Sequence, residues 1–331
     1  MILLTGCNGS LGSQLATRLV SEGHAVKGYV RTGANLSMIP QKIKEQIEWC
    51  SGSLFDSYSL GKALEGVDQI IHTAAVVSFA PSRRKEMFRT NVEGTAVLVN
   101  EALVAGVKQF IHISSIAALG RPVGKSHIDE TDLWVESEGN TNYAKSKYLA
   151  ELEVYRGFEE GLNGFVLNPS VILSPGDIEK SSTKLFGYVL KGGAYYTEGH
   201  LNYVDVRDVC NILLLLMKKQ VNGERFIVNG GQISYKYFFD KVAMEFGKNA
   251  PDKKATIWKK ELIWRIEYIR SLMSGSEPLI TKETARLSGN HHHYDNGKIK
   301  ALLTYDFHAI EDSISWVCKE LTKQPAVHNL L

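Results

Sequence analysis

The chain has 331 residues, of which 44% are apolar and 22% are charged, enough for one large core or two ordinary ones. These values exclude a disordered tail and a small cross-linked scaffold. The 38 basic and 36 acidic side chains nearly cancel, and no long block of like charge points to a nucleic-acid partner.

The four cysteines are scattered and include no C-x-x-C pair. This pattern fits neither a zinc site nor a disulfide framework, and it favours a reducing compartment. The longest apolar runs, such as Ile212 to Met217, are much shorter than the ~18–20 residues of a membrane span. The first residues lack the basic start and cleavage site of a secretory leader. We therefore expect a cytoplasmic protein without a membrane anchor.

Short apolar runs alternate with helical patterns along the first half of the chain. Strands are expected at 2–5, 25–30, 47–50, 69–73, 109–114 and 165–168, and helices at 10–22, 56–65, 84–105 and 142–160. This alternation predicts an α/β fold with a doubly wound parallel sheet, whose ligands bind at the carboxyl ends of the strands. Leu11, Leu15 and Leu19 form one apolar stripe, which places the first helix against the sheet.

Beyond residue 168 the pattern becomes irregular. Tyrosine and glycine are frequent in the turns at 192–196, and one more strand is expected at 225–229. No Pro- or Ser-rich linker separates the two halves. We expect a first domain over 1–168 and a smaller, interleaved lobe over 169–331, with 200–230 returning to the first domain.

A glycine-rich turn lies where the first strand must lead into the first helix. Gly6, Gly9 and Gly12 follow a G-x-x-G-x-x-G spacing. The first suits a tight turn, the second close approach of a pyrophosphate, and the third helix–strand contact. The N–H groups of the following helix N-terminus favour bound phosphate. Tight strand-to-helix turns also need glycine, but the position in the first βαβ unit favours a dinucleotide site.

The second strand ends without a carboxylate. Folds that prefer NAD usually place an acidic residue there for the ribose 2′-hydroxyl, but 25–41 contains no Asp or Glu. Arg31 follows this strand instead, and its guanidinium suits a 2′-phosphate. A solvated loop arginine is the alternative. We expect NADPH to be preferred over NADH.

Tyr143 and Lys147 form a Y-x-x-x-K pair, whose spacing puts phenol and ammonium on one helix face. To act as a base near pH 7, a tyrosine must lower its pKa of ~10 by ~3 units, or ~4 kcal/mol, and an adjacent cation is one source. Ser114 and Ser115 end the apolar strand at 110–113, at the edge where chemistry is expected, and a hydroxyl there can bind a carbonyl oxygen. Singly these are ordinary helix-surface and strand-end residues. Together they predict a catalytic group.

Seven ordered motifs resemble those of the extended short-chain dehydrogenase/reductase family, over nearly the whole chain. They are TGCNGSLG at 5–12, HTAA at 72–75, NVEGT at 91–95, HISSIAALG at 112–120, YAKSK at 143–147, LNPSVIL at 167–173 and NYVDVRDV at 202–209. Within the family the chain looks most like the branch of dihydroflavonol reductases and 3β-hydroxysteroid dehydrogenases, which often carries the label NAD-dependent epimerase/dehydratase. The resemblance implies a Rossmann-type NAD(P)-binding domain at 1–168 and a mainly substrate-binding lobe at 169–331.

The resemblance also implies residue roles. Tyr143 would be the general acid/base, and Lys147 would lower its pKa and hold the nicotinamide ribose. Ser115 matches the catalytic serine, with Ser114 as a second candidate, and Asn91 would steady the turn after the fourth strand. The cofactor-binding set would be Gly6, Asn8, Gly9, Ser10, Leu11, Gly12, Arg31, Ser53, Leu54, Thr73, Ala74, Ala75, Asn91, Ser114, Tyr143, Lys147, Pro169 and Val171. The substrate would meet Phe79, Ser115, Ile116, Tyr143 and Tyr203.

Two departures from the family pattern bear on function. The third strand of relatives usually ends in a Gly-Asp-Leu-like stretch whose carboxylate contacts adenine, whereas this chain has Ser53 at that position. Sugar-nucleotide dehydratases carry acidic residues directly after the catalytic serine. Ile116 and Ala117 follow Ser115 here, which disfavours dehydration.

Three weaker signals have plain structural readings. The segment 251–275 mixes basic and apolar residues and could lie on a membrane surface, but a helix covering the second lobe is favoured. The histidines at 291–293, followed by Asp295, lack the spacing of metal ligands, so we expect a solvated loop and no metal site. Asp205 and Asp208 look like paired carboxylates, and the resemblance implies a structural tie.

These patterns predict an NADPH-dependent oxidoreductase that reduces a small-molecule carbonyl to an alcohol. A nucleotide-sugar epimerase with a tightly bound cofactor is the nearest alternative, and a non-catalytic dinucleotide sensor is the third. The helices at 84–105 and 142–160 correspond to a pair through which related enzymes often dimerise. We therefore expect a homodimer, with apolar contacts from Val97, Val104, Leu149 and Leu152, although these residues could also face the sheet.

Overall fold

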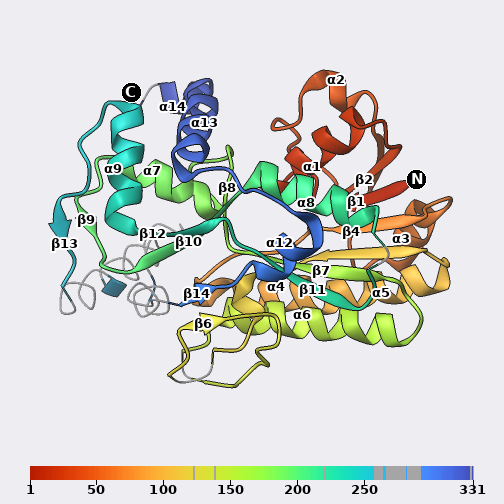
Figure 1. Cartoon of the computed structure of the whole chain (residues 1–331). Coiled ribbons are helices and arrows are strands. Elements are labelled where there is room, and N and C mark those ends of the chain that lie inside the picture. Colours follow the sequence, from red (N-terminus) through yellow and green to blue (C-terminus); the bar gives the residue numbers. More distant parts are fainter. Residues whose placement is uncertain are drawn as a thin grey trace.

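Seven parallel strands form the central sheet of the protein, which we describe from a computed structural model (Figure 1). The structure describes residues 1–121, 124–137, 139–219, 221–256, 264–265, 281, 292–328 and 330. The strands lie in the order β11-β7-β5-β4-β1-β2-β3. In chain order they are β1 (Ile2–Thr5), β2 (Val26–Val30), β3 (Glu48–Ser51), β4 (Gln69–His72), β5 (Gln109–Ile113), β7 (Gly164–Pro169) and β11 (Glu224–Val228).

The sheet confirms the predicted doubly wound α/β fold. All residues of β1 and β7 are buried, as expected for central strands of a parallel sheet with both faces covered. The chain builds β1, β2 and β3 outward on one side, and then crosses to β4 on the other side of β1. Such a reversal leaves a crevice at the carboxyl ends of β1 and β4, where ligands of these folds bind.

Helices cover the sheet on both faces (Figure 1). On one face lie α1 (Ser10–Ser21) and α8 (Val206–Met217), which contribute with the sheet to one apolar cluster. Leu15 and Leu19 of α1 are fully buried, as its leucine stripe predicts. The short α2 (Gln41–Lys44) lies near α1. On the other face lie α3 (Ser57–Leu64), α5 (Gly94–Val104) and α6 (Asn142–Glu159).

The single helix predicted at 84–105 is divided into three parts. After a 3₁₀ turn at Pro81–Arg83, the chain forms α4 (Arg84–Phe88), a π-helical turn (Arg89–Glu93) and α5. The π turn contains the buried Asn91. Wider turns of this kind are frequent at functional sites.

A second lobe is built around the three-stranded sheet β12-β10-β8. Its strands are β8 (Val171–Leu173), β10 (His200–Asp205) and β12 (Gly231–Ser234). Phe186 and Phe238 lie at the centre of its own apolar cluster. The helices of this lobe are α7 (Lys184–Leu190), α9 (Tyr235–Phe246), α13 (Ile310–Thr322) and α14 (Pro325–His328) (Figure 1).

The stretch 200–230 connects the two sheets. It begins in β10 of the smaller sheet, continues through α8 on the central sheet, and ends in β11, which pairs with β7 at the edge of the central sheet. Helix α12 (Gly297–Leu303) packs against β11. Two short parallel pairs complete the fold: β6 (His127–Ile128) with β14 (His293–Tyr294), and β9 (Tyr195–Tyr196) with β13 (Lys253–Lys254).

The structure corrects the start of the basic helix predicted at 251–275. Lys253 and Lys254 form strand β13 through backbone pairing with Tyr195 and Tyr196, so the helix does not begin there. Residues 257–263 and 266–275 of that prediction lie outside the described residues. Among the helices that the structure describes, none is both long and apolar enough to cross a bilayer.

Candidate active site

The glycine-rich turn between β1 and α1 has no room for side chains. Gly6 has a φ of 74°, and a Cβ there would lie 2.6 Å from Thr73 Oγ1 and 2.7 Å from the Ala74 nitrogen. A Cβ on Gly12 would lie 2.1 Å from the Gly6 carbonyl oxygen. Both glycines are therefore required, one by the left-handed backbone and one by the close contact of helix and turn.

The N-terminus of α1 is suited to an anion. Gly9 is the N-cap and has no side chain to accept a hydrogen bond, and the first turn contains no acidic residue. A Cβ on Gly176, in the loop after β8, would lie only 2.9 Å from Ser10 Oγ. The two loops therefore form a narrow, side-chain-poor cradle over the helix N-terminus. These features fit the pyrophosphate of a dinucleotide.

The carboxyl ends of β1 and β4 are fastened together beside this cradle. The Thr73 hydroxyl donates to the Thr5 carbonyl oxygen at 2.7 Å, and the Ala74 amide donates to Thr5 Oγ1 at 3.3 Å. His72 contacts Thr5 Oγ1 through Nδ1 and Thr95 Oγ1 through Nε2, at 2.7 and 3.0 Å. These contacts hold one wall of the crevice in place.

Arg31 and Ser53 follow the neighbouring strands β2 and β3 at the same edge of the sheet. The Arg31 side chain is exposed. The Ser53 hydroxyl accepts from the Phe55 amide at 3.2 Å, and the Leu54 side chain lies against Gly94 at the start of α5. The positions suit the adenosine half of a dinucleotide, and their roles in cofactor binding remain predictions.

Tyr143 lies in the first turn of α6, whose N-cap is Thr141. The Thr141 hydroxyl accepts from the Ala144 amide at 3.0 Å. Ser115 follows β5 in extended conformation and faces the Tyr143 phenol. The ring of Phe79 meets the Tyr143 ring edge-on, with 5.7 Å between centroids. The structure therefore brings together three residues that the sequence placed in the active site.

The expected lowering of the Tyr143 pKa is not found. Burial raises the pKa of this phenol above its usual value, and hydrogen bonding by Ser115 opposes the rise only in part. The Lys147 ammonium donates to the Ile113 carbonyl oxygen at 2.9 Å, and its predicted effect on the pKa of the phenol stays a prediction. Tyr143 is thus a protonated phenol at neutral pH, which suits a proton donor better than a base.

Lys147 is almost completely buried, with 2% of its surface exposed. Burial lowers the pKa of its ammonium to about 8, and the nearby Glu151 carboxylate acts in the opposite direction. The lysine lies one turn after Tyr143 on α6, as the motif predicts. Its hydrogen bond to β5 joins the helix that carries Tyr143 to the strand that leads to Ser115.

Asn91 holds the loop after β4 against α6. Its side chain accepts from the Val76 amide at 2.7 Å and donates to the Val76 carbonyl oxygen and to Ser146 Oγ, both at 3.0 Å. Ser146 in turn donates to the Tyr143 carbonyl oxygen at 2.8 Å. The amide of Asn91 thus steadies the loop that carries Phe79, in agreement with the role implied by the resemblance.

The two neighbouring serines point to different surroundings. Ser115 faces Tyr143, whereas the buried Ser114 faces the Glu151 carboxylate. Burial raises the pKa of Glu151, and hydrogen bonding by Ser114 opposes this rise only in part. This geometry favours Ser115 over Ser114 as the serine that would meet a substrate. Sequence reasoning missed Glu151. The signal that could have found it is its position four residues after Lys147, on the same face of α6.

The comparisons with known proteins agree with this site. The sequence model of the NAD dependent epimerase/dehydratase family matches residues 2–229, more than half of the chain. The chain belongs to this family. It is an enzyme of the extended short-chain dehydrogenase/reductase type, a group whose members are NAD(P)-dependent oxidoreductases, dehydratases and epimerases.

Three similar proteins illustrate the family relationship. Sterol demethylase protein B of Methylococcus capsulatus is 34% identical over 236 residues, 69% of each chain. A protein of Synechocystis sp. named after dihydroflavonol 4-reductase is 27% identical over 305 residues, 89% of this chain and 87% of that protein. The crystal structure of gox2253 has a TM-score of 0.82 at 30% identity and covers 98% of both chains.

The remaining predicted contacts of this epimerase/dehydratase family member lie in packed regions. Ile116 is 9% exposed and packs in a small cluster with Ile128 and Tyr294. Tyr203 is 7% exposed, with its ring in the core of the second lobe. Pro169 and Val171 end β7 and begin β8, at the junction of the two lobes. The contacts of these residues with substrate or cofactor remain predictions.

Asp205 and Asp208 act as structural ties, as the resemblance implies. Asp205 caps α8 by accepting from the Arg207 amide at 2.8 Å, and it also pairs with the Arg207 guanidinium. Asp208 accepts from the Tyr305 hydroxyl at 2.8 Å and from the His308 amide at 3.1 Å. Both carboxylates therefore fasten α8 and the segment that follows α12.

The predicted histidine loop is partly a strand. His293 lies in β14, paired with β6, while residue 291 is outside the described part of the chain. Within the described ranges, no three His, Cys, Asp or Glu side chains are grouped as metal ligands would be.

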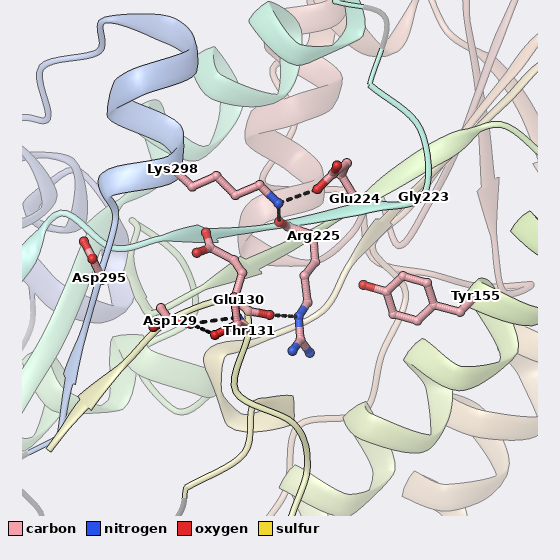
Figure 2. Close-up of a pocket in the computed structure, with 9 residues that line it drawn as sticks. All are labelled: Asp129, Glu130, Thr131, Tyr155, Gly223, Glu224, Arg225, Asp295 and Lys298. Atoms are coloured by element: carbon pink, nitrogen blue, oxygen red, sulfur yellow. Dashed lines mark hydrogen bonds and ion pairs between the residues drawn. The ribbon is translucent and has the colours of Figure 1, made fainter. Parts of the chain in front are cut away.

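A cavity of about 620 Å³ lies away from the candidate active site (Figure 2). It opens near the amino end of β11, whereas Ser115 and Tyr143 lie at the opposite, carboxyl edge of the sheet. Its walls are formed by Asp129, Glu130, Thr131, Tyr155, Gly223, Glu224, Arg225, Asp295 and Lys298. None of the three predicted catalytic residues belongs to this set.

Proposed function

We propose that the protein reduces a carbonyl group of a small molecule to an alcohol, with NADPH as the hydride donor. The observation that carries the proposal is the pairing of a protonated Tyr143 phenol with Ser115 beside the buried Lys147. This arrangement supports a site that gives a proton to an oxygen atom. The names of reductase relatives are consistent with it.

Ser115, Tyr143 and Lys147 each have a separate role in the proposed carbonyl reduction. The Ser115 hydroxyl donates to the carbonyl oxygen and polarises it. NADPH, held at the glycine-rich turn, would supply a hydride to the carbonyl carbon. Tyr143 gives its phenolic proton to the oxygen on which charge develops, and the resulting phenolate is stabilised by the Lys147 ammonium until solvent restores the proton.

The proposed preference for NADPH rests on the end of β2. Arg31 is exposed there, at the edge of the sheet that also carries the phosphate cradle. A guanidinium binds a 2′-phosphate through charge-assisted hydrogen bonds, while an NAD-preferring site would present a carboxylate. The stretch 25–41 contains no carboxylate.

The direct test of this function is a screen of aldehydes, ketones and nucleotide sugars with NADPH and with NADH. We expect the absorbance at 340 nm to fall with a carbonyl compound and NADPH. If the absorbance falls with none of the substrate classes, the proposal is contradicted.

A nucleotide-sugar epimerase is the second candidate, because the family description includes epimerases. An epimerase keeps its cofactor bound and first oxidises and then reduces one substrate. Copurified dinucleotide, together with sugar conversion and no net change at 340 nm, would favour this function over carbonyl reduction.

A further inference from the structure

Glu151 lies on the catalytic face of α6 but is hidden from solvent. Tyr143, Lys147 and Glu151 follow one another at intervals of four residues, which places them on one side of the helix. Only 1% of the Glu151 surface is exposed. A buried carboxylate is strongly unfavourable unless donors and cations surround it, so its partners are informative.

Three neighbouring strands, β5, β7 and β11, bring partners to the Glu151 carboxylate. Asn168, from β7, donates from Nδ2 to Oε1 at 2.5 Å. Ser114 faces it from the end of β5. Arg225, from β11, places Nη1 3.8 Å from Oε2. Burial raises the pKa of this carboxyl group, and the surrounding donors and cations oppose that rise by stabilising the carboxylate charge.

Two of these contacts lead back to the predicted catalytic residues. The same Nδ2 of Asn168 donates to the Ser115 carbonyl oxygen at 3.0 Å, so the carboxylate orients the amide that holds the Ser115 backbone. Lys147 lies one helical turn before Glu151. The negative charge of the carboxylate raises the pKa of the lysine ammonium and so opposes the lowering by burial.

The other titratable groups around Lys147 do not replace this charge. His72 of β4 and His112 of β5 are buried near it, and burial lowers the pKa of both imidazoles far below neutrality. Tyr143, on the same helix, is a neutral phenol. Among the described residues, Glu151 is the carboxylate whose charge supports the Lys147 ammonium.

The Arg225 side chain is held by backbone carbonyl groups of the segment that follows β6. Its Nε donates to the Glu130 carbonyl oxygen at 2.8 Å, and its Nη2 donates to the Asp132 carbonyl oxygen at 2.9 Å. Figure 2 shows this side chain extending from β11 along the cavity wall, with Tyr155 of α6 beyond it. The guanidinium therefore balances Glu151 without reaching the catalytic residues.

We propose that Glu151, balanced by Arg225, is a positioning residue that keeps the Lys147 ammonium protonated and, through Asn168, aligns Ser115 for carbonyl reduction. The part that concerns carbonyl reduction rests on the proposed function. The part that concerns the charge of Lys147 does not.

The first test follows the protonation of Lys147 directly, without substrate. Protein labelled with ¹³C at lysine Cε is titrated by NMR, and the Lys147 signal is assigned by its absence in Lys147→Arg. We expect a midpoint of about 8 in the wild type and a midpoint lower by one unit or more, a tenfold change in proton affinity, in Glu151→Gln. Glu153→Gln is the matched control, because Glu153 lies on the same helix and pairs with Arg156 at the surface. An unchanged Lys147 midpoint in folded Glu151→Gln would overturn the proposal.

A second variant guards against misfolding. Glu151→Gln leaves the Arg225 guanidinium without its counter-charge, whereas Glu151→Gln combined with Arg225→Met removes both charges. The double variant is expected to show the same lowered Lys147 midpoint. Glu151→Asp, which restores the charge, is expected to return the midpoint toward that of the wild type. A double variant with the wild-type midpoint would contradict the proposed role.

The second readout is the pH profile of kcat/KM for carbonyl reduction. In Glu151→Gln the alkaline limb is expected to move to lower pH by the same amount as the Lys147 titration. A lower rate with an unmoved limb would mean that Glu151 has only a structural role. If the NMR midpoint moves but the wild type reduces no carbonyl compound, the proposed function fails while the charge relationship stands.

Discussion

Lys147 is bound to the backbone of Ile113, not to the phenol of Tyr143. Its Nζ donates to the Ile113 carbonyl oxygen at 2.9 Å, two residues before Ser115. The lysine therefore joins α6 to β5. It sets the distance between the helix that carries Tyr143, the proposed proton donor, and the strand that leads to Ser115. In the proposed mechanism its charge stabilises the phenolate once the proton has left Tyr143.

The phosphate cradle makes Gly12 indispensable. In Gly12→Ala the new Cβ would overlap the Gly6 carbonyl oxygen, so we expect a loss of about 3 kcal/mol in stability and at least tenfold weaker NADPH binding. Gly61→Ala is the matched control, because Gly61 lies in α3 with no atom near a Cβ, and it should stabilise by about 0.5–1 kcal/mol. Urea unfolding and NADPH fluorescence titration measure both quantities. Equal behaviour of the two variants would contradict the role given to the turn.

The exposed Arg31 carries the predicted cofactor preference. Removing one charge-assisted contact costs about 1.5–3 kcal/mol, so Arg31→Ala should lower kcat/KM for NADPH about 10- to 150-fold. The value for NADH should stay nearly unchanged. Lys42→Ala, on α2 nearby, removes another positive charge and serves as control. An equal loss of kcat/KM with both cofactors would show that Arg31 does not bind the 2′-phosphate.

The buried His72 makes the free energy of unfolding depend on pH. Burial lowers its pKa from 6.5 to about 3, so the unfolded chain binds a proton that the folded chain does not between these values. Stability is therefore lost as the pH falls below 6.5, by about 2–3 kcal/mol at pH 4.5 from this group. The free energy of unfolding of His72→Gln should fall less steeply with acid than that of wild type, whereas exposed His328→Gln should match wild type. Equal slopes for His72→Gln and wild type would be inconsistent with a buried neutral imidazole.

The proposed homodimer would use α5 and α6. The two helices pack side by side, and Val104 and Leu152 remain 85% and 45% exposed. Light scattering should give twice the chain mass at micromolar concentration, and the Val104→Asp, Leu152→Asp double variant should give the monomer mass. Met244→Asp, at an exposed position of α9, is the control. A monomeric wild type would exclude this expectation.

Periodicity predicted the central sheet well, because its strands are short apolar runs between amphipathic helices. It missed the division of 84–105, since a π turn shifts the helical pattern by only one residue. The strands of the second lobe, such as β12, are half-buried and short, and their pattern is correspondingly weak.

The predicted catalytic trio was visible because three motifs occur in order, but its electrostatics were not. Spacing places Tyr143 and Lys147 on one face without showing that the ammonium reaches the Ile113 carbonyl. Glu151 was missed because a glutamate in a helix is normally solvated. Only the structure brings Asn168 and Arg225, distant in sequence, to its carboxylate.

The most direct measurement is the NADPH-dependent turnover of Tyr143→Phe with a carbonyl compound that the wild type reduces. The variant loses only the phenolic hydroxyl and keeps the ring contact with Phe79. Turnover should fall by about 10²–10⁴, while NADPH affinity stays within about twofold of the wild type. Wild-type turnover in this variant would contradict the assignment of Tyr143 as the proton donor.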